Sequence, residues 1–74
     1  MPHVKIWHFE TTVPQEKQNR FVEEVTSLLV ETFGCPPDAV SLDTVPVPPA
    51  TWDCVFEREI EPHLPRLWKT PDYQ

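Results

Sequence analysis

A long helical pattern between two short strand patterns constrains the fold more than any other feature of this chain. From Gln15 to Phe33 the apolar residues recur at intervals of three or four, which places them on one face of a helix. These residues are Phe21, Val25, Leu28, Leu29 and Phe33. Gly34 follows immediately, where a left-handed cap is expected to end the helix. Two strands joined by such a crossover helix are normally parallel, so a β-α-β unit is predicted.

Both flanking strand patterns alternate along the chain. In residues 3–9, successive side chains are expected to point to opposite faces of a sheet. One set is Val4, Ile6 and His8, and the other is Lys5, Trp7 and Phe9. The second strand is expected over residues 40–47. Because Pro46 lacks an N–H, the end of this strand is expected to lie at a sheet edge or where the chain leaves the sheet. Because one helix covers only one face of a two-stranded sheet, a second copy of the chain is expected to cover the other.

The residues after the second strand are predicted to form a short helical extension. Thr51 can cap a helix that begins at Trp52, and a second helical turn is expected to start at Pro62. Residues 69–74 are expected to form a tail. The chain has 74 residues without a linker, an internal repeat or a low-complexity stretch, so residues 1–74 are predicted to be a single domain.

The composition excludes several classes of partner. The net charge is −6, from 12 acidic and 6 basic residues, which argues against nucleic acid and anionic membranes. No apolar run is long enough to span a membrane. The two cysteines, Cys35 and Cys54, and the three histidines lack the spacing of zinc ligands, so no metal site is expected. Free thiols predict a cytoplasmic protein, and the small core favours oligomerisation.

Pro2 is the residue with the most distinctive chemistry. Once Met1 is removed, the Pro2 nitrogen becomes a secondary amine at the head of a strand. Burial disfavours the charged form of an amine and lowers its pKa toward neutral, the range that proton-transfer catalysis requires. While Met1 remains, the same nitrogen belongs to an amide and cannot act as a base. Pro2 is therefore the candidate catalytic general acid and base.

Several short motifs, in this order along the chain, resemble one known family. They are Met1-Pro2 with Val4 and Ile6, then Gln15-Glu16-Lys17-Gln18, then Gly34 with Pro36, Pro37 and Val40, and then Pro49 with Trp52. This pattern, within residues 1–56, is similar to the 4-oxalocrotonate tautomerase family. Later residues look like its narrower branch of small phenylpyruvate tautomerases: Glu59, Ile60, Pro62, Lys69, Pro71 and Tyr73.

The resemblance implies both a fold and an activity. The fold is α/β (α+β), a tautomerase-type β-α-β unit with a C-terminal helical extension and a sheet completed by dimerisation. The activity is that of a cofactor-independent isomerase that interconverts keto and enol groups through Pro2. The resemblance to the narrower branch implies a dimer. In that branch a longer C-terminal segment, here residues 57–74, alters the surface used for further assembly. A homodimer is therefore expected.

The chain also departs from the family pattern. Two arginines that bind a dicarboxylate in the best-known members correspond here to Thr12 or Val13 and to Ser41. Arginine is the natural partner of a carboxylate, so their absence argues against a dicarboxylate substrate. The family's aromatic wall residue corresponds to Trp52. A site with an amine base and an aromatic wall suits an aromatic or apolar 2-keto acid such as phenylenolpyruvate.

The sequence leaves open which group holds the substrate carboxylate. The candidates are Lys5, Arg58 and a group from the second subunit, and Ser41 is a candidate substrate contact. His3 is expected to be structural, because its side chain points away from the Pro2 ring in a regular strand. An alternative interpretation keeps the fold but makes the chain a small oligomeric ligand-binding protein with little or no catalysis. A third, hydration or dehalogenation of an unsaturated acid by the same amine, lacks an acid–arginine pair to support it.

Overall fold

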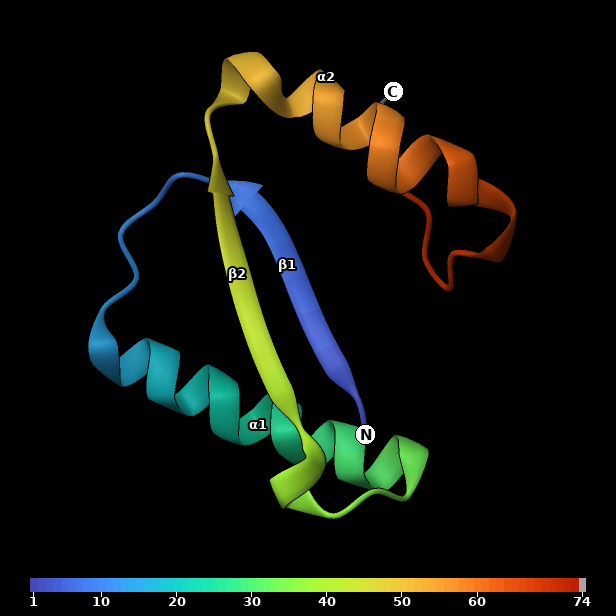
Figure 1. Cartoon of the computed structure of the whole chain (residues 1–74). Coiled ribbons are helices and arrows are strands. Elements are labelled where there is room, and N and C mark those ends of the chain that lie inside the picture. The colour runs from blue at the N-terminus through green and yellow to red at the C-terminus, as the bar shows by residue number, and fades with distance from the viewer. Residues whose placement is uncertain (74) are drawn as a thin grey trace.

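The computed structural model describes residues 1–73 and has the predicted β-α-β order followed by a helical extension (Figure 1). Its main elements are strand β1 at His3–Phe9, helix α1 at Gln15–Phe33, strand β2 at Ser41–Val47 and helix α2 at Trp52–Val55. Short 3-10 turns precede the second strand and the second helix, at Pro37–Ala39 and Pro49–Thr51. The predicted bounds of the first strand and the long helix are confirmed.

The two strands are parallel and pair in continuous register, from His3 opposite Ser41 to Phe9 opposite Val47. Strand β2 begins one residue later than predicted. The N–H of Val40 donates to the carbonyl of Pro37 over 3.2 Å and thereby closes the preceding turn. Only from Ser41 onward is the backbone free to join the sheet.

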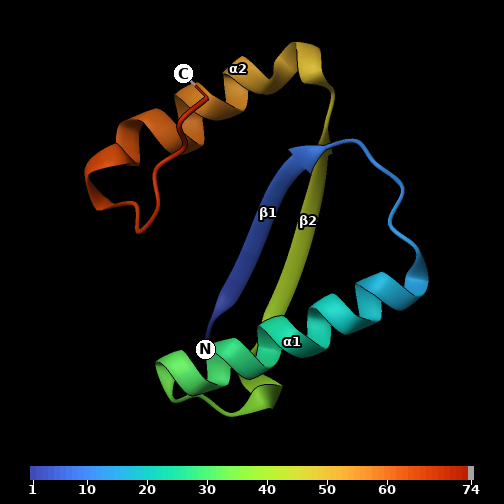
Figure 2. The ribbon, with the colours of Figure 1, turned by 180° about the vertical axis from the view of Figure 1, so that it is seen from behind.

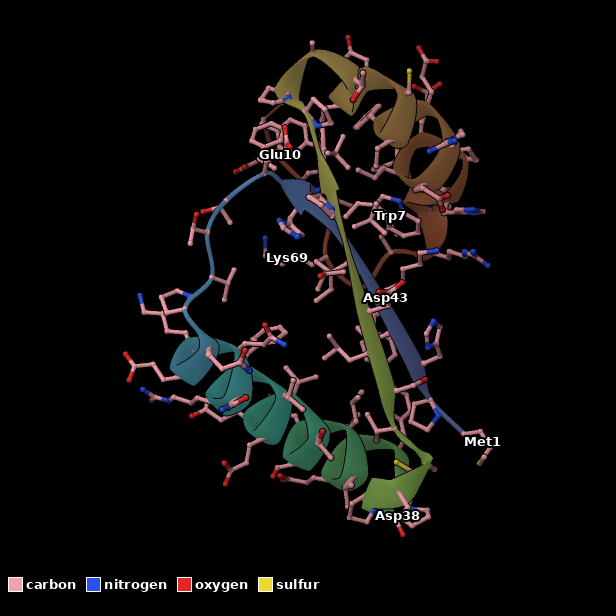
Figure 3. All side chains as sticks on the ribbon, turned by 60° about the vertical axis from the view of Figure 1, so that its left-hand side comes forward. Met1, Trp7, Glu10, Asp38, Asp43 and Lys69 are labelled. Carbon is pink, nitrogen blue, oxygen red and sulfur yellow. The ribbon has the colours of Figure 1, made fainter. Side chains whose placement is uncertain are left out.

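Helix α1 and the C-terminal segment, residues 48–73, lie on opposite sides of the two strands (Figure 3). Seen from behind, α1 crosses in front of the sheet (Figure 2). Ile6 and His8 face α1, where they line a cavity together with Phe21. Phe9, on the opposite face, contacts Trp52 of the C-terminal segment. The predicted alternation is confirmed, and the C-terminal segment occupies part of the face assigned to a second copy.

Helix α1 ends where the sequence predicts. Gly34 has a φ of 66°, and its N–H donates to the carbonyl of Val30 over 2.9 Å. Glycine adopts this left-handed conformation without the steric cost of a Cβ atom. On the exposed side of the helix Arg20 donates to Glu24 over 2.9 Å. This hydrogen bond and the charge of Glu24 raise the pKa of the Arg20 guanidinium, although exposed pairs contribute little stability.

Residues 49–66 of the C-terminal segment form one continuous run of helical turns that changes pitch along its length. After α2 a wide π-helical turn, Phe56–Ile60, leads directly into a 3-10 turn, Glu61–Arg66. This 3-10 turn corresponds to the second helical turn predicted from Pro62, and it begins one residue earlier, at Glu61. Pro62 fits in the first positions of that turn, where its missing N–H is not needed. The predicted tail is described as far as Tyr73, and Gln74 lies outside the described residues.

A single copy of the chain buries few side chains completely. Within residues 1–73 the buried apolar side chains are Val47 and Val55, at 6% and 4% exposure. Leu28 is 60% exposed on α1. Phe33 stacks on Trp68 with ring centroids 6.0 Å apart, yet Trp68 remains 87% exposed. One copy therefore leaves extensive apolar surface open to water. Within residues 1–73, none of the helices combines the length and the apolar character that a membrane span requires.

Candidate active site

Pro2 lies immediately before β1 at one end of the sheet. The ring is half-buried, and the carbonyl of Pro2 accepts a hydrogen bond from the N–H of Ser41 over 3.2 Å. This bond is the first of the parallel ladder that pairs His3 with Ser41, and it holds the head of the strand. The side chain of Met1 is fully exposed. The amine that would result from removal of Met1 thus belongs to a well-positioned residue at the open end of a sheet.

Ser41 contacts the head of β1 through its side chain as well as its backbone. Its Oγ lies 2.6 Å from Nδ1 of His3, the residue opposite it in the register. Both side chains are exposed. The structure therefore brings Ser41 close to both Pro2 and His3. The strand pattern alone had predicted only a structural role for His3.

Trp52 belongs to an aromatic cluster formed by Phe9, Trp52, Phe56 and Tyr73. The Trp52 ring meets Phe9 edge-on, with centroids 5.1 Å apart, and its Nε1 donates to the Tyr73 hydroxyl over 3.1 Å. Tyr73 in turn lies edge-on to Phe56, at 6.3 Å. Phe9, Trp52 and Tyr73 line an almost wholly apolar cavity. Of these residues, the sequence indicated only Trp52 as a site residue. The alternation of β1 explains why Phe9 lies on this face. No local sequence pattern predicts that Tyr73 contacts Trp52.

Pro2 and the aromatic cluster lie at opposite ends of the sheet in one copy of the chain (Figure 1). Pro2 precedes the first residue of β1, whereas Trp52 contacts Phe9, its last residue. At the usual rise per residue, such a strand separates the two sites by roughly 20 Å. One copy therefore does not bring the candidate base and the candidate aromatic wall together.

Lys5 and Arg58 occupy different parts of the molecule. Lys5 is exposed on β1, two residues after His3 and on the same face, and its Nζ lies 5.4 Å from the centroid of the Trp7 ring. Arg58 is exposed on the π-helical turn of the C-terminal segment, next to the aromatic cluster in sequence. Lys5 is thus on the strand that follows Pro2, and Arg58 is on the same segment as Trp52. Within residues 1–73, no three potential metal ligands come together.

The chain has clear relatives among known proteins. Residues 2–52 match the sequence model of a family described as tautomerase enzyme. Tautomerase PptA of Pectobacterium carotovorum subsp. carotovorum is 32% identical over 74 residues, and Tautomerase PptA of Klebsiella pneumoniae is 32% identical over 73. Each alignment covers 99% of this chain and 97% of the relative. These matches support tautomerase activity, an isomerisation. The chain belongs to the tautomerase family.

Proposed function

We propose that the chain is a homodimeric, cofactor-independent keto–enol tautomerase acting on an aromatic or apolar 2-keto acid such as phenylenolpyruvate. The observation that carries this proposal is the position of Pro2, directly before β1 with its carbonyl held by the Ser41 N–H. Loss of Met1 would leave a secondary amine at this end of the sheet. Membership of the tautomerase family supports the class of reaction.

In the proposed reaction, the neutral Pro2 nitrogen takes the proton of the enol hydroxyl. The resulting prolinium then returns a proton to the adjacent carbon as the carbonyl forms. The transition state carries developing enolate charge, which a positioned donor or cation must stabilise. The backbone N–H groups of Val40 and Ser41 are already bonded to the carbonyls of Pro37 and Pro2. In the proposal, the prolinium itself stabilises this charge.

The proposed active site needs two copies of the chain. Trp52 lies too far from Pro2 to form a wall for a substrate held in the same copy, so the partner supplies the aromatic cluster. Exposed apolar side chains on α1 offer a surface for association, among them Phe21, Val22 and Leu28. Burying them would also add stability that so small a core lacks.

The charge and the cysteines of the chain bear on its partners and its cellular compartment. With a net charge of −6, the chain is expected to bind neither nucleic acid nor an anionic membrane surface. Cys35 and Cys54 are free thiols in the structure. Free thiols are typical of a reducing compartment, so we place the protein in the cytoplasm.

A ligand-binding role is the second candidate function. It is favoured by the cavity of Phe9, Trp52 and Tyr73, which is lined by aromatic rings and lies far from Pro2 in the same copy. An aromatic acid could occupy this cavity without meeting the amine. In that case the chain would bind its ligand on a tautomerase fold with little or no turnover.

The rate of phenylenolpyruvate ketonisation separates the two functions. The assay uses protein whose mass shows that Met1 is absent, and a matched protein that retains one residue before Pro2. If Pro2 is the base, the extended protein loses about 100- to 10,000-fold in rate while its circular dichroism and its size remain unchanged. Equal rates would show the proline mechanism to be wrong. No acceleration by either protein, with the aromatic acid still bound, would support the ligand-binding role.

A further inference from the structure

The hydrogen bond between His3 and Ser41 joins the two strands beside the candidate base. Nδ1 of His3 and Oγ of Ser41 are 2.6 Å apart, and the Ser41 N–H holds the carbonyl of Pro2. Ser41 is therefore in contact with both residues at the head of β1. Since both side chains are exposed, they remain accessible to a bound molecule.

The direction of this hydrogen bond decides what Ser41 can offer to a ligand. A hydroxyl has a single hydrogen. If Ser41 donates it to His3, only lone pairs remain, and these repel an anion. If Nδ1–H of His3 is the donor, the Ser41 hydrogen is free to point outward. His3 donates in its Nδ1–H tautomer and in its protonated form.

We propose that His3 and Ser41 together form the subsite that holds the carboxylate of the 2-keto acid. Nδ1–H of His3 donates to Ser41 Oγ, and the Ser41 hydroxyl donates to the carboxylate. This inference rests on the proposed function, in which the substrate lies against the Pro2 amine. His3 is a positioning residue here, because it acts through Ser41.

The chemistry of the pair also defines the class of substrate. A hydroxyl supplies one hydrogen bond, whereas an arginine supplies a charged two-pronged clamp. A subsite of this kind holds one carboxylate weakly, and the remaining binding energy must come from an apolar group. The preferred ligand is therefore an aryl or alkyl 2-keto monocarboxylate rather than a dicarboxylate.

Lys5 is the competing candidate for the carboxylate. It lies two residues further along β1 on the same face as His3, and it is exposed. Its Nζ is 5.4 Å from the centroid of the Trp7 ring, and Asp43 is its partner in the strand register. The Lys5 charge thus already lies near an aromatic ring, whereas the hydrogen bond to His3 ties the Ser41 hydroxyl to the head of β1.

Four substitutions test the subsite by steady-state kinetics on phenylenolpyruvate. Ser41→Ala removes the hydroxyl, His3→Leu removes its donor, and His3→Asn keeps an N–H near the place of Nδ1. Lys5→Met, on the same face, removes the charge of the competing candidate. We expect S41A and H3L to raise KM by roughly tenfold, the loss of one hydrogen bond to a charged group, with kcat within about twofold. H3N should restore KM to near the wild-type value.

The outcomes distinguish this inference from the function on which it rests. Wild-type KM values in S41A and H3L, a large effect of K5M alone, or failure of H3N to restore binding would each overturn it. If Pro2-dependent turnover is absent, the proposed function fails instead. The subsite is then tested on the wild-type protein and S41A by comparing binding of 3-phenylpropionate and its uncharged amide. The carboxylate must bind more tightly to the wild type, and S41A must lose that preference.

Discussion

Trp52 donates a hydrogen bond from its indole Nε1 to the hydroxyl of Tyr73 over 3.1 Å. This bond joins the first residue of α2 to the tail of the chain. Because Trp52 also meets Phe9 edge-on at 5.1 Å, the tail is connected through two aromatic rings to the end of β1. The aromatic cluster is thus assembled from the sheet, the second helix and the tail, and its geometry depends on a residue near the C-terminus.

Replacing Tyr73 by Phe should loosen the tail without removing its ring. The substitution deletes the hydrogen bond to Trp52 and keeps the contact with Phe56. A net hydrogen bond contributes about 0.5–1.5 kcal/mol, and the lower end applies because Tyr73 is 55% exposed. Urea unfolding at fixed protein concentration measures the loss. Thr70→Val, at an exposed tail position, is the control, and an equal change in both variants would contradict the role of the bond.

Gly34 should be the most sensitive position at the end of α1. Its φ of 66° is unfavourable for a residue with a Cβ atom, although the space around it is open. Gly34→Ala is therefore expected to lower the free energy of unfolding by about 1–2 kcal/mol through the backbone alone. Gly34→Asn should cost less, because asparagine tolerates the left-handed conformation. Equal losses in thermal or urea unfolding would show that the cap conformation is not the cause.

Much of the fold follows from local sequence signals. The period of the apolar residues defines α1, Gly34 ends it, and the alternation of residues 3–9 assigns the faces of β1. These features depend on neighbouring residues, so the sequence alone is sufficient. The start of β2 was displaced by one residue because a turn hydrogen bond from Val40 competes with strand pairing.

The candidate site was less predictable because its contacts join residues far apart in the chain. Pro2 is indicated by its position after Met1, and Trp52 by the resemblance to the tautomerase family. The bond between His3 and Ser41 depends on the strand register, which no local pattern specifies. The contact of Tyr73 with Trp52 depends on the path of the C-terminal segment, whose helical turns change pitch three times.

A charge on the apolar surface of α1 should weaken the proposed dimer. Leu28 is 60% exposed in a single copy, so Leu28→Glu leaves the folded protomer nearly undisturbed. At an interface, the same carboxylate would lose its hydration without a partner. We expect the dissociation constant of the dimer to rise at least about tenfold, as measured by sedimentation equilibrium. Glu31→Gln, at an exposed polar position of the same helix, is the control. An unchanged constant in L28E would place the interface elsewhere.

Mixing two inactive variants tests whether the partner supplies the aromatic wall. The first retains Met1, which blocks the Pro2 amine, and the second carries Trp52→Ala. In a mixed dimer with a shared site, the free amine of the second variant faces the intact Trp52 of the first. With random exchange between two-fold symmetric dimers, about a quarter of the wild-type sites should return. Ketonisation of phenylenolpyruvate before and after exchange measures the recovery.

The same experiment has a clear opposite outcome. If the base and the wall belonged to one copy, every site in the mixed dimer would lack one of the two groups, and mixing would restore nothing. A control with Leu28→Glu added to both variants should suppress recovery, because it weakens exchange into mixed dimers. Since Pro2 and Trp52 lie at opposite ends of β1 and β2 in one copy, we expect recovery in the first mixture and none in the control.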